Sequence, residues 1–212
     1  MTMEAAAALA RNDRYVREFV EAFDLCPYAK RCRETGRLHR RVVEQAGDAL
    51  SAALSAIAAI EALPEDSVEV ALLLFPGAAT GSTEAARAFE DFCGQVREGM
   101  ARAHPAGSPP FFCVAFHPDL PGDVSDASRA VHFIRRSPDP TLQLVRASVL
   151  RAVRGSRTGG STFVDASRLT LAELLAVSSP IGLSDRIAEA NLETIEREGA
   201  AKLGSLLTGM RG

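Results

Sequence analysis

Apolar residues near the start of the chain recur at steps of three and four, which is the spacing of one face of a helix. They are Leu9, Val16, Phe19, Val20 and Phe23. The pattern predicts an amphipathic helix over about residues 4–24. Pro27 ends it, and because proline is favoured as the first residue of a helix, a second short helix is expected to continue to about Arg33. Cys26 would then be the N-cap residue of that second helix.

Two short and almost wholly apolar runs predict strands that are covered on both faces. Residues 68–75 read VEVALLLF and residues 111–116 read FFCVAF, and a proline follows each run closely. The residues between them have the apolar spacing of a helix from Gly81 to about Arg102. A strand, a helix and a strand in succession favour two parallel strands joined by a right-handed crossover. Both strands would then end at the same edge of the sheet, where open α/β sheets usually bind ligands.

The remaining patterns complete the expected secondary structure. Asp139-Pro140 is expected to open a helix, because aspartate is a good N-cap and proline a good first residue. The other expected elements are strands over 38–44, 131–134 and 161–165, helices over 48–62, 169–176 and 184–207, and a connector over 154–160.

Together these elements predict one α/β domain over residues 1–212, with a short, mostly parallel sheet flanked by helices and a C-terminal helix packed across it. Its 47% hydrophobic and 24% charged content suits a single sizeable core. The formal net charge of -3 provides no basic field for nucleic acid or an anionic membrane. The longest weakly polar run, 49–63, is shorter than a membrane span. No signal peptide is recognised, so a cytoplasmic location with reduced cysteines is expected.

Cys26, in the segment CPYAK, is the strongest candidate for chemistry. Free amides and the positive end of the helix dipole lower the pKa of a thiol at a helix N-terminus, and Lys30 would add to this effect. Cys26 is therefore predicted to be an activated thiol with a depressed pKa. The alternative is a space-filling side chain, because free cysteine is among the most buried residue types.

His117 and Asp119 follow the apolar run at 111–116, so they are expected at the ligand-binding edge of the sheet. There His117 would act as a general acid or base, and Asp119 would orient its ring. A catalytic pair of Cys26 and His117 requires the two side chains to lie within hydrogen-bond distance. The alternative is that His117 and Asp119 cap the strand and shape the turn around Pro118.

Basic and hydroxyl side chains near the centre of the chain suggest a site for an anion. The candidate anion-binding residues are Lys30, Arg135, Arg136, Ser137 and Arg146. Guanidinium groups and the free amides of a helix starting near Asp139 together could bind the phosphate or carboxylate of a small molecule. The alternative is that the arginines form ordinary ion pairs, for example with Asp123 or Asp126.

Signatures of common cofactor and metal enzymes are missing. The sequence contains no GxGxxG after a strand, no GxxxxGK[ST], no HExxH and no GxSxG. The four cysteines also lack the spacing of a zinc ribbon or a CxxC pair. The sequence therefore assigns no cofactor and no metal ligand, and it leaves the oligomeric state open.

Three elements, CPYAK at 26–30, FHPD at 116–119 and RRSPDPTLQLVR at 135–146, resemble those of a bacterial family known as domain of unknown function 1415. The resemblance spans about residues 16–153 and leaves a C-terminal helical extension over about 169–207. It brings no activity with it, but it implies that the three elements selected for chemistry share a pocket. The matching residues are Cys26, Pro27, Ala29, His117, Pro118, Arg136, Ser137, Pro138, Pro140, Thr141, Leu142 and Arg146.

The chain departs from the pattern of that family at Asp139, Gln143 and Ala147, where the family has Tyr, His and Glu. A metal site built on that His and Glu would be lost here. The leading hypothesis from the sequence is an enzyme that acts on an anionic small molecule through Cys26 and His117. The alternatives are a non-catalytic module that binds a phosphate or carboxylate, and a metal-binding protein.

Overall fold

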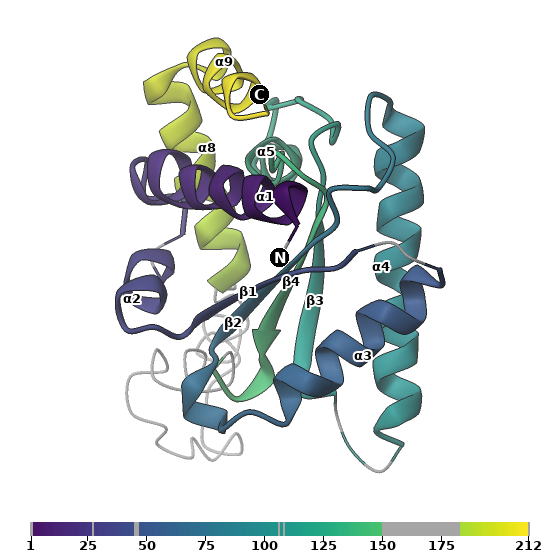
Figure 1. Ribbon diagram of the computed structural model, residues 1–212. Coiled ribbons are helices and arrows are strands. Elements are labelled where there is room, and N and C mark those ends of the chain that lie inside the picture. The colour runs from purple at the N-terminus through teal and green to yellow at the C-terminus, as the bar shows by residue number, and fades with distance from the viewer. Residues whose placement is uncertain are drawn as a thin grey trace, which may run out of the picture.

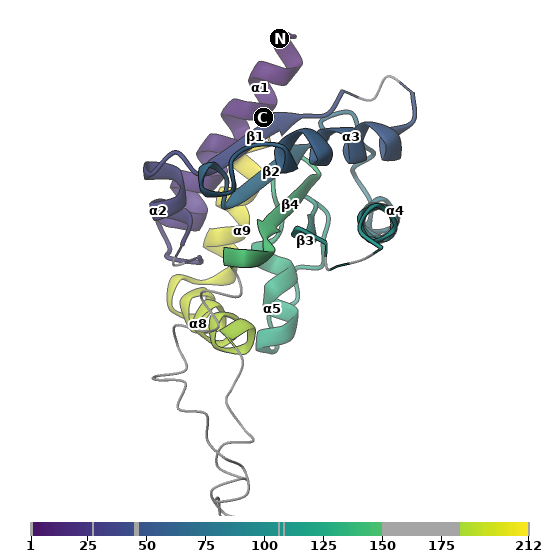
Figure 2. The ribbon, with the colours of Figure 1, turned by 90° about the horizontal axis from the view of Figure 1, so that it is seen from below.

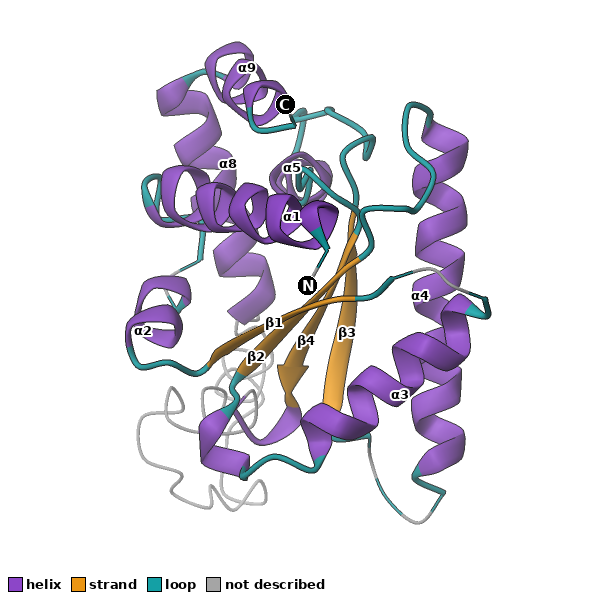
Figure 3. Cartoon of the chain, viewed as in Figure 1, coloured by secondary structure: helices purple, strands orange, loops and turns teal. Residues whose placement is uncertain are grey.

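The computed structural model describes residues 2–26, 28–44, 47–105, 107, 109–149 and 183–211. Within them, helices surround a single sheet (Figure 3), which confirms the α/β class. Pro27 and the connector, strand and helix expected over 154–176 lie outside these residues. No helix in the described ranges is long and apolar enough to cross a membrane.

The sheet has four strands and stands at the centre of the molecule (Figure 1). They are β1 (Leu38–Val42), β2 (Val70–Leu74), β3 (Phe111–Phe116) and β4 (Thr141–Arg146), in the order β1-β2-β4-β3. β1 pairs with β2 in parallel, whereas β4 is antiparallel to both β2 and β3. The first three strands therefore run in one direction, and β2 and β3 end at the same edge, as the sequence predicted. The sheet is mixed because β4 lies between them.

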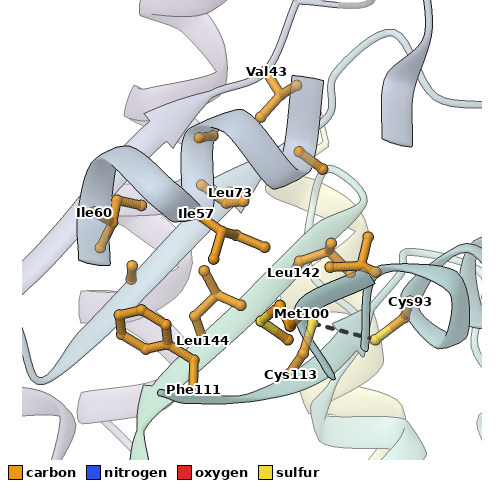
Figure 4. Close-up of a cluster of buried hydrophobic side chains, with 14 of the residues drawn as sticks. Val43, Ile57, Ile60, Leu73, Cys93, Met100, Phe111, Cys113, Leu142 and Leu144 are labelled. Carbon is orange, nitrogen blue, oxygen red and sulfur yellow. Dashed lines mark hydrogen bonds between the residues drawn. The ribbon is translucent and has the colours of Figure 1, made fainter. Parts of the chain in front are cut away.

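Two helices, α3 (Ala49–Glu61) and α4 (Thr83–Ala103), cover one face of the sheet (Figure 1). Their N-caps are Asp48 and Ser82, whose side chains accept hydrogen bonds from the amides of Leu50 and Ala85. A short 3-10 helix, η2 (Glu65–Ser67), links α3 to β2. The side chains of this first core include Ile57, Leu73, Phe111, Leu142 and Leu144 (Figure 4). Because strand side chains alternate, the intervening positions face the other side.

The other face carries the remaining helices (Figure 2). α1 (Met3–Arg14) continues as a π-helix, η1 (Tyr15–Glu21), and is followed by α2 (Ala29–Glu34). α5 (Ala127–Ile134), α8 (Leu183–Glu198) and α9 (Ala200–Gly209) complete this layer. The closing helix expected from the sequence is divided by Gly199, which has a φ of 88° and ends α8. The second core includes Phe19, Leu72, Leu74, Phe133 and Leu203.

The prediction of a helix beginning at Asp139 is wrong, because residues 141–146 form β4. More and less buried side chains alternate along this segment, and Leu142 and Leu144 both belong to the first core. Gln143, between them, lies against the opposite side of the sheet. The alternation at a period of two is the strand signal that the apparent cap Asp139-Pro140 concealed.

The prediction of a strand over 131–134 is also wrong, because these residues form the end of α5. The helix begins earlier, where the side chain of Asp126 accepts a hydrogen bond from the Arg129 amide at 2.9 Å. The segment before residue 131 is polar and shows no apolar periodicity. Its capping aspartate supplies the start signal that the apolar pattern alone does not reveal.

Candidate functional site

A cavity of about 320 Å³ lies between the second face of the sheet and the helices that cover it. Residues from all four strands contribute to it, together with α1, η1, α2, α5 and α8. Its lining is mainly apolar and includes Val16, Leu25, Leu72, Phe116 and Ile134. Small-molecule sites usually combine such an apolar enclosure with a few polar groups. We refer to it as the central cavity.

Cys26 lines the central cavity from the turn between η1 and α2. Burial raises the pKa of its thiol, and hydrogen bonds from the amides of Tyr28 and Ala29 only partly offset this effect. The structure therefore does not support the depressed pKa expected at a helix N-terminus. Lys30 is exposed and is not among the described residues that line the cavity.

His117 lies beside the first core, where its ring centroid is 5.7 Å from that of Phe89. The side chain is completely buried. Its Nε2 donates to the Ala79 carbonyl at 3.0 Å, and its Nδ1 accepts the Asp119 backbone N–H at 3.2 Å. These partners define the neutral tautomer with its proton on Nε2. Burial lowers the pKa of His117, which keeps this neutral form favoured.

The structure does not bring Cys26 and His117 together, because Cys26 lines the central cavity and His117 packs against the first core on the other face. The carboxylate of Asp119 accepts the Gly81 amide at 2.5 Å and lies 3.2 Å from the guanidinium of Arg211. Its separation from Nδ1 of His117 is 3.8 Å. Asp119 thus connects the loop after β2, the turn after β3 and the C-terminal segment.

Arg135 and Ser137 both line the central cavity, at the end of α5. The Ser137 hydroxyl donates to the carbonyl of Asp139 at 2.6 Å, so it serves the turn before β4. The guanidinium of Arg135 lies over the ring of Phe116, 5.9 Å from its centroid. Burial lowers the pKa of Arg135, and no described carboxylate forms an ion pair with it. It is the one charged side chain among the described residues of the lining.

The other two arginines predicted to bind an anion lie away from the central cavity. Nε of Arg136 donates to the Pro118 carbonyl at 3.3 Å. Arg146 occupies the far end of β4, where its Nε donates to the Val68 carbonyl at 2.8 Å and its guanidinium lies 4.9 Å from the Phe111 centroid. Of the predicted anion-binding residues, only Arg135 and Ser137 therefore share one site.

Comparison with known families supports the family that the sequence resembles. The family described as "Protein of unknown function (DUF1415)" matches residues 7–163. The chain belongs to the DUF1415 family. No curated protein and no solved structure matches it. The matched residues of this DUF1415 protein include every residue of the central cavity contributed by the strands, by η1 and by α5.

Gln143 and Ala147, where the resemblance implies His and Glu in the family, lie in different places. Gln143 lines the central cavity from the middle of β4, whereas Ala147 is buried beyond the end of that strand. Among the residues that the structure describes, no group of three or more His, Cys, Asp and Glu could hold a metal ion.

Sequence reasoning missed the amide side chains of the cavity in this DUF1415 protein: Asn12 of α1, Gln143 of β4 and Asn191 of α8. The side chains of Asn12 and Asn191 are almost completely buried, with 3% and 2% of their surface exposed. Each interrupts the apolar face of an amphipathic helix. A polar residue at such a position is uncommon and was the available signal.

Proposed function

We propose that the protein binds a small organic anion, with an apolar body enclosed by the central cavity and a carboxylate held by Arg135. The main support for this proposal is that the described part of the cavity lining holds a single positive charge. Arg135 is its one charged side chain among the described residues, and no described carboxylate is paired with it. A guanidinium matches a carboxylate through two parallel hydrogen bonds, so a bound carboxylate would offset the burial of this charge.

Two other partly buried arginines differ from Arg135 because each has a carboxylate partner. Arg11 and Arg33, each 22% exposed at the side chain, have a carboxylate within hydrogen-bond distance, from Asp139 and Glu21 respectively. Burying a charge without a partner is costly, and the chain has provided partners at those positions. Arg135 has no such partner among the described residues and belongs to the cavity lining. Arg146, 6% exposed and with an Nη2 that has no hydrogen-bond partner in the described part of the chain, is a buried exception outside the central cavity.

Binding is favoured over thiol catalysis by the composition of the same lining. A cysteine nucleophile needs a base beside it or a lowered pKa. The described lining contains Cys26 but no His, Asp or Glu, and burial raises the pKa of Cys26. The alternative that the sequence offered, a module that binds a phosphate or carboxylate, is therefore the better supported one, with the carboxylate as the anion that suits an apolar enclosure.

The proposal is tested by calorimetric titration with 3-phenylpropionate, a carboxylate with a compact apolar body, and with the neutral 3-phenylpropanol. We expect Arg135→Gln to weaken binding of 3-phenylpropionate by roughly 10- to 100-fold and to leave 3-phenylpropanol unaffected. Arg136→Gln, a neighbouring arginine outside the described lining, is the matched control and should change neither. Failure of the carboxylate to bind at millimolar concentration, or equal binding to both arginine variants, would overturn the proposal.

A further inference from the structure

Two buried amide atoms of the central cavity have no hydrogen-bond partner among the described residues. They are Oδ1 of Asn12 and Nδ2 of Asn191. Both side chains line the cavity, Asn12 from α1 and Asn191 from α8. The wall of the cavity therefore contains one unused acceptor and one unused donor, both closed off from solvent in this structure.

The unused atoms are a departure from the normal state of a protein interior. Leaving a buried polar atom without a partner is costly, and most such atoms are satisfied. Two other polar groups of the lining follow that rule. Tyr15 donates its hydroxyl to the Ile134 carbonyl at 2.6 Å, and Thr141 donates to the Asp139 carbonyl at 2.8 Å. Among the described lining residues, Asn12 and Asn191 are the two left with completely buried, unpartnered atoms.

The groups that would satisfy these two atoms are known from their chemistry. Oδ1 of Asn12 needs a donor, and Nδ2 of Asn191 needs an acceptor. A secondary amide supplies both, with an N–H on one side and a carbonyl on the other. The amide of a ligand could therefore contact α1 and α8 while its carboxylate reaches Arg135 at the end of α5.

We propose that the ligand class of the central cavity is an N-acyl amino acid with an apolar side chain. Its amide would bind Asn12 and Asn191, its carboxylate Arg135 and its apolar side chain the remaining lining. This inference rests on the proposed function and specifies the ligand further. The cavity of about 320 Å³ lies at the lower end of small-molecule sites, which suits a compact member of the class such as N-acetyl-L-phenylalanine.

The test compares ligands that differ by one group, by calorimetric titration of the full chain. N-acetyl-L-phenylalanine carries all three groups, 3-phenylpropionate lacks the amide, and N-acetyl-N-methyl-L-phenylalanine lacks the amide N–H. We expect the first to bind at least 10-fold more tightly than either of the others. Loss of a hydrogen-bonding group leaves a buried partner unsatisfied, and this is the source of the difference.

Asn12→Leu and Asn191→Leu are suitable variants, because each removes the amide while keeping a side chain of similar shape. Replacing an unsatisfied polar group by an apolar one is expected to maintain or raise stability, so both variants should fold. Each should remove the advantage of N-acetyl-L-phenylalanine over 3-phenylpropionate. Thermal denaturation of both variants provides the check on folding.

The outcomes separate this inference from the proposed function. If 3-phenylpropionate binds in a manner that depends on Arg135 but the acetylated ligand has no advantage, the inference is overturned and the proposed function stands. If N-acetyl-L-phenylalanine still binds more tightly than 3-phenylpropionate in both leucine variants, the asparagines do not bind the amide. The inference is then again overturned. If neither compound binds the wild-type protein, the proposed function fails and the inference fails with it.

Discussion

Arg11 holds the carboxylate of Asp139 through two hydrogen bonds, from Nε at 2.9 Å and from a terminal nitrogen at 2.7 Å. The pair connects α1 to the turn before β4. Arg11 directly precedes Asn12, which lines the central cavity. Side-chain exposure is 22% for Arg11 and 10% for Asp139, so most of this contact is removed from water. The contact helps to fix the position from which Asn12 reaches the central cavity.

We predict that Asp139→Asn lowers the free energy of unfolding by about 2 kcal/mol. The substitution leaves the partly buried Arg11 guanidinium without a countercharge, and such a charge costs more than the loss of an exposed pair. Urea denaturation of the two proteins measures the difference. Glu98→Gln is the matched control, because its pair with Arg102 is 73% and 68% exposed and should contribute less than about 0.5 kcal/mol. Equal effects in the two variants would show that burial of the Arg11 pair is unimportant.

The fold could be predicted where one periodicity dominated. β2 and β3 were found because short apolar runs without helical spacing suit a covered strand. β4 was missed because Asp139-Pro140 has the residues of a helix start, while the alternation of Leu142, Gln143 and Leu144 spans too few positions to outweigh it. The insertion of β4 between β2 and β3 depends on long-range pairing, which local sequence does not encode.

The candidate site could be predicted only in part. Cys26 and Arg135 were selected from local chemistry, and both line the central cavity. His117 was expected to accompany them because it follows β3, but a strand end gives access to either face of a sheet. Side-chain alternation directs Phe116 to the cavity and His117 to the first core. That choice of face depends on packing partners elsewhere in the chain.

Acidification should destabilise the protein through His117. Its pKa in the folded state is lowered by burial, so the unfolded chain binds the proton more readily. The stabilisation is fully present above the unfolded pKa of about 6.5 and is lost progressively as the pH falls from there toward the lower folded pKa. We therefore expect the drop in thermal stability between pH 7.5 and pH 5.5 to be smaller in His117→Gln, which retains one donor and one acceptor without titrating. An unchanged drop would contradict the assignment.

His104 should have the opposite effect and serves as the control for the pH series. Its Nδ1 lies 2.9 Å from the Met100 carbonyl and its Nε2 lies 2.8 Å from Glu61. Both contacts raise the pKa of His104, so its stabilisation is present below about 6.5 and is lost as the pH rises through the folded value. His104→Gln should therefore make the loss of stability on acidification steeper. If both histidine variants changed the loss of stability on acidification in the same direction, neither histidine would dominate the pH dependence.

Cysteine alkylation should report on the central cavity. Burial raises the pKa of Cys26, so at pH 7.5 its reaction with iodoacetamide should be slower than that of free cysteine. Cys93 and Cys113 lie 3.4 Å apart in the first core (Figure 4) and should react only after unfolding. Saturating 3-phenylpropionate should slow the reaction of Cys26 further, because the ligand and the thiol share the cavity. Site-resolved mass spectrometry measures the alkylation rate of each cysteine. If Cys26 reacted with iodoacetamide faster than free cysteine does, the activated-thiol hypothesis would be restored.

Alanine substitutions at two glycines of α4 distinguish the effect of helix propensity on stability from the effect of packing. An alanine Cβ at Gly99 would lie 2.7 Å from a methyl carbon of Leu54 on α3, whereas at Gly94 the nearest side-chain atom is a guanidinium nitrogen of Arg97 at 3.9 Å. Alanine in a helix gains up to about 1 kcal/mol over glycine. Gly94→Ala should therefore raise stability by about that amount. In Gly99→Ala the overpacking against Leu54 costs about 1–3 kcal/mol and exceeds the gain, so a net loss is expected. Urea denaturation of both variants tests the contact between α3 and α4, and stabilisation by both substitutions would show that Leu54 moves aside without cost.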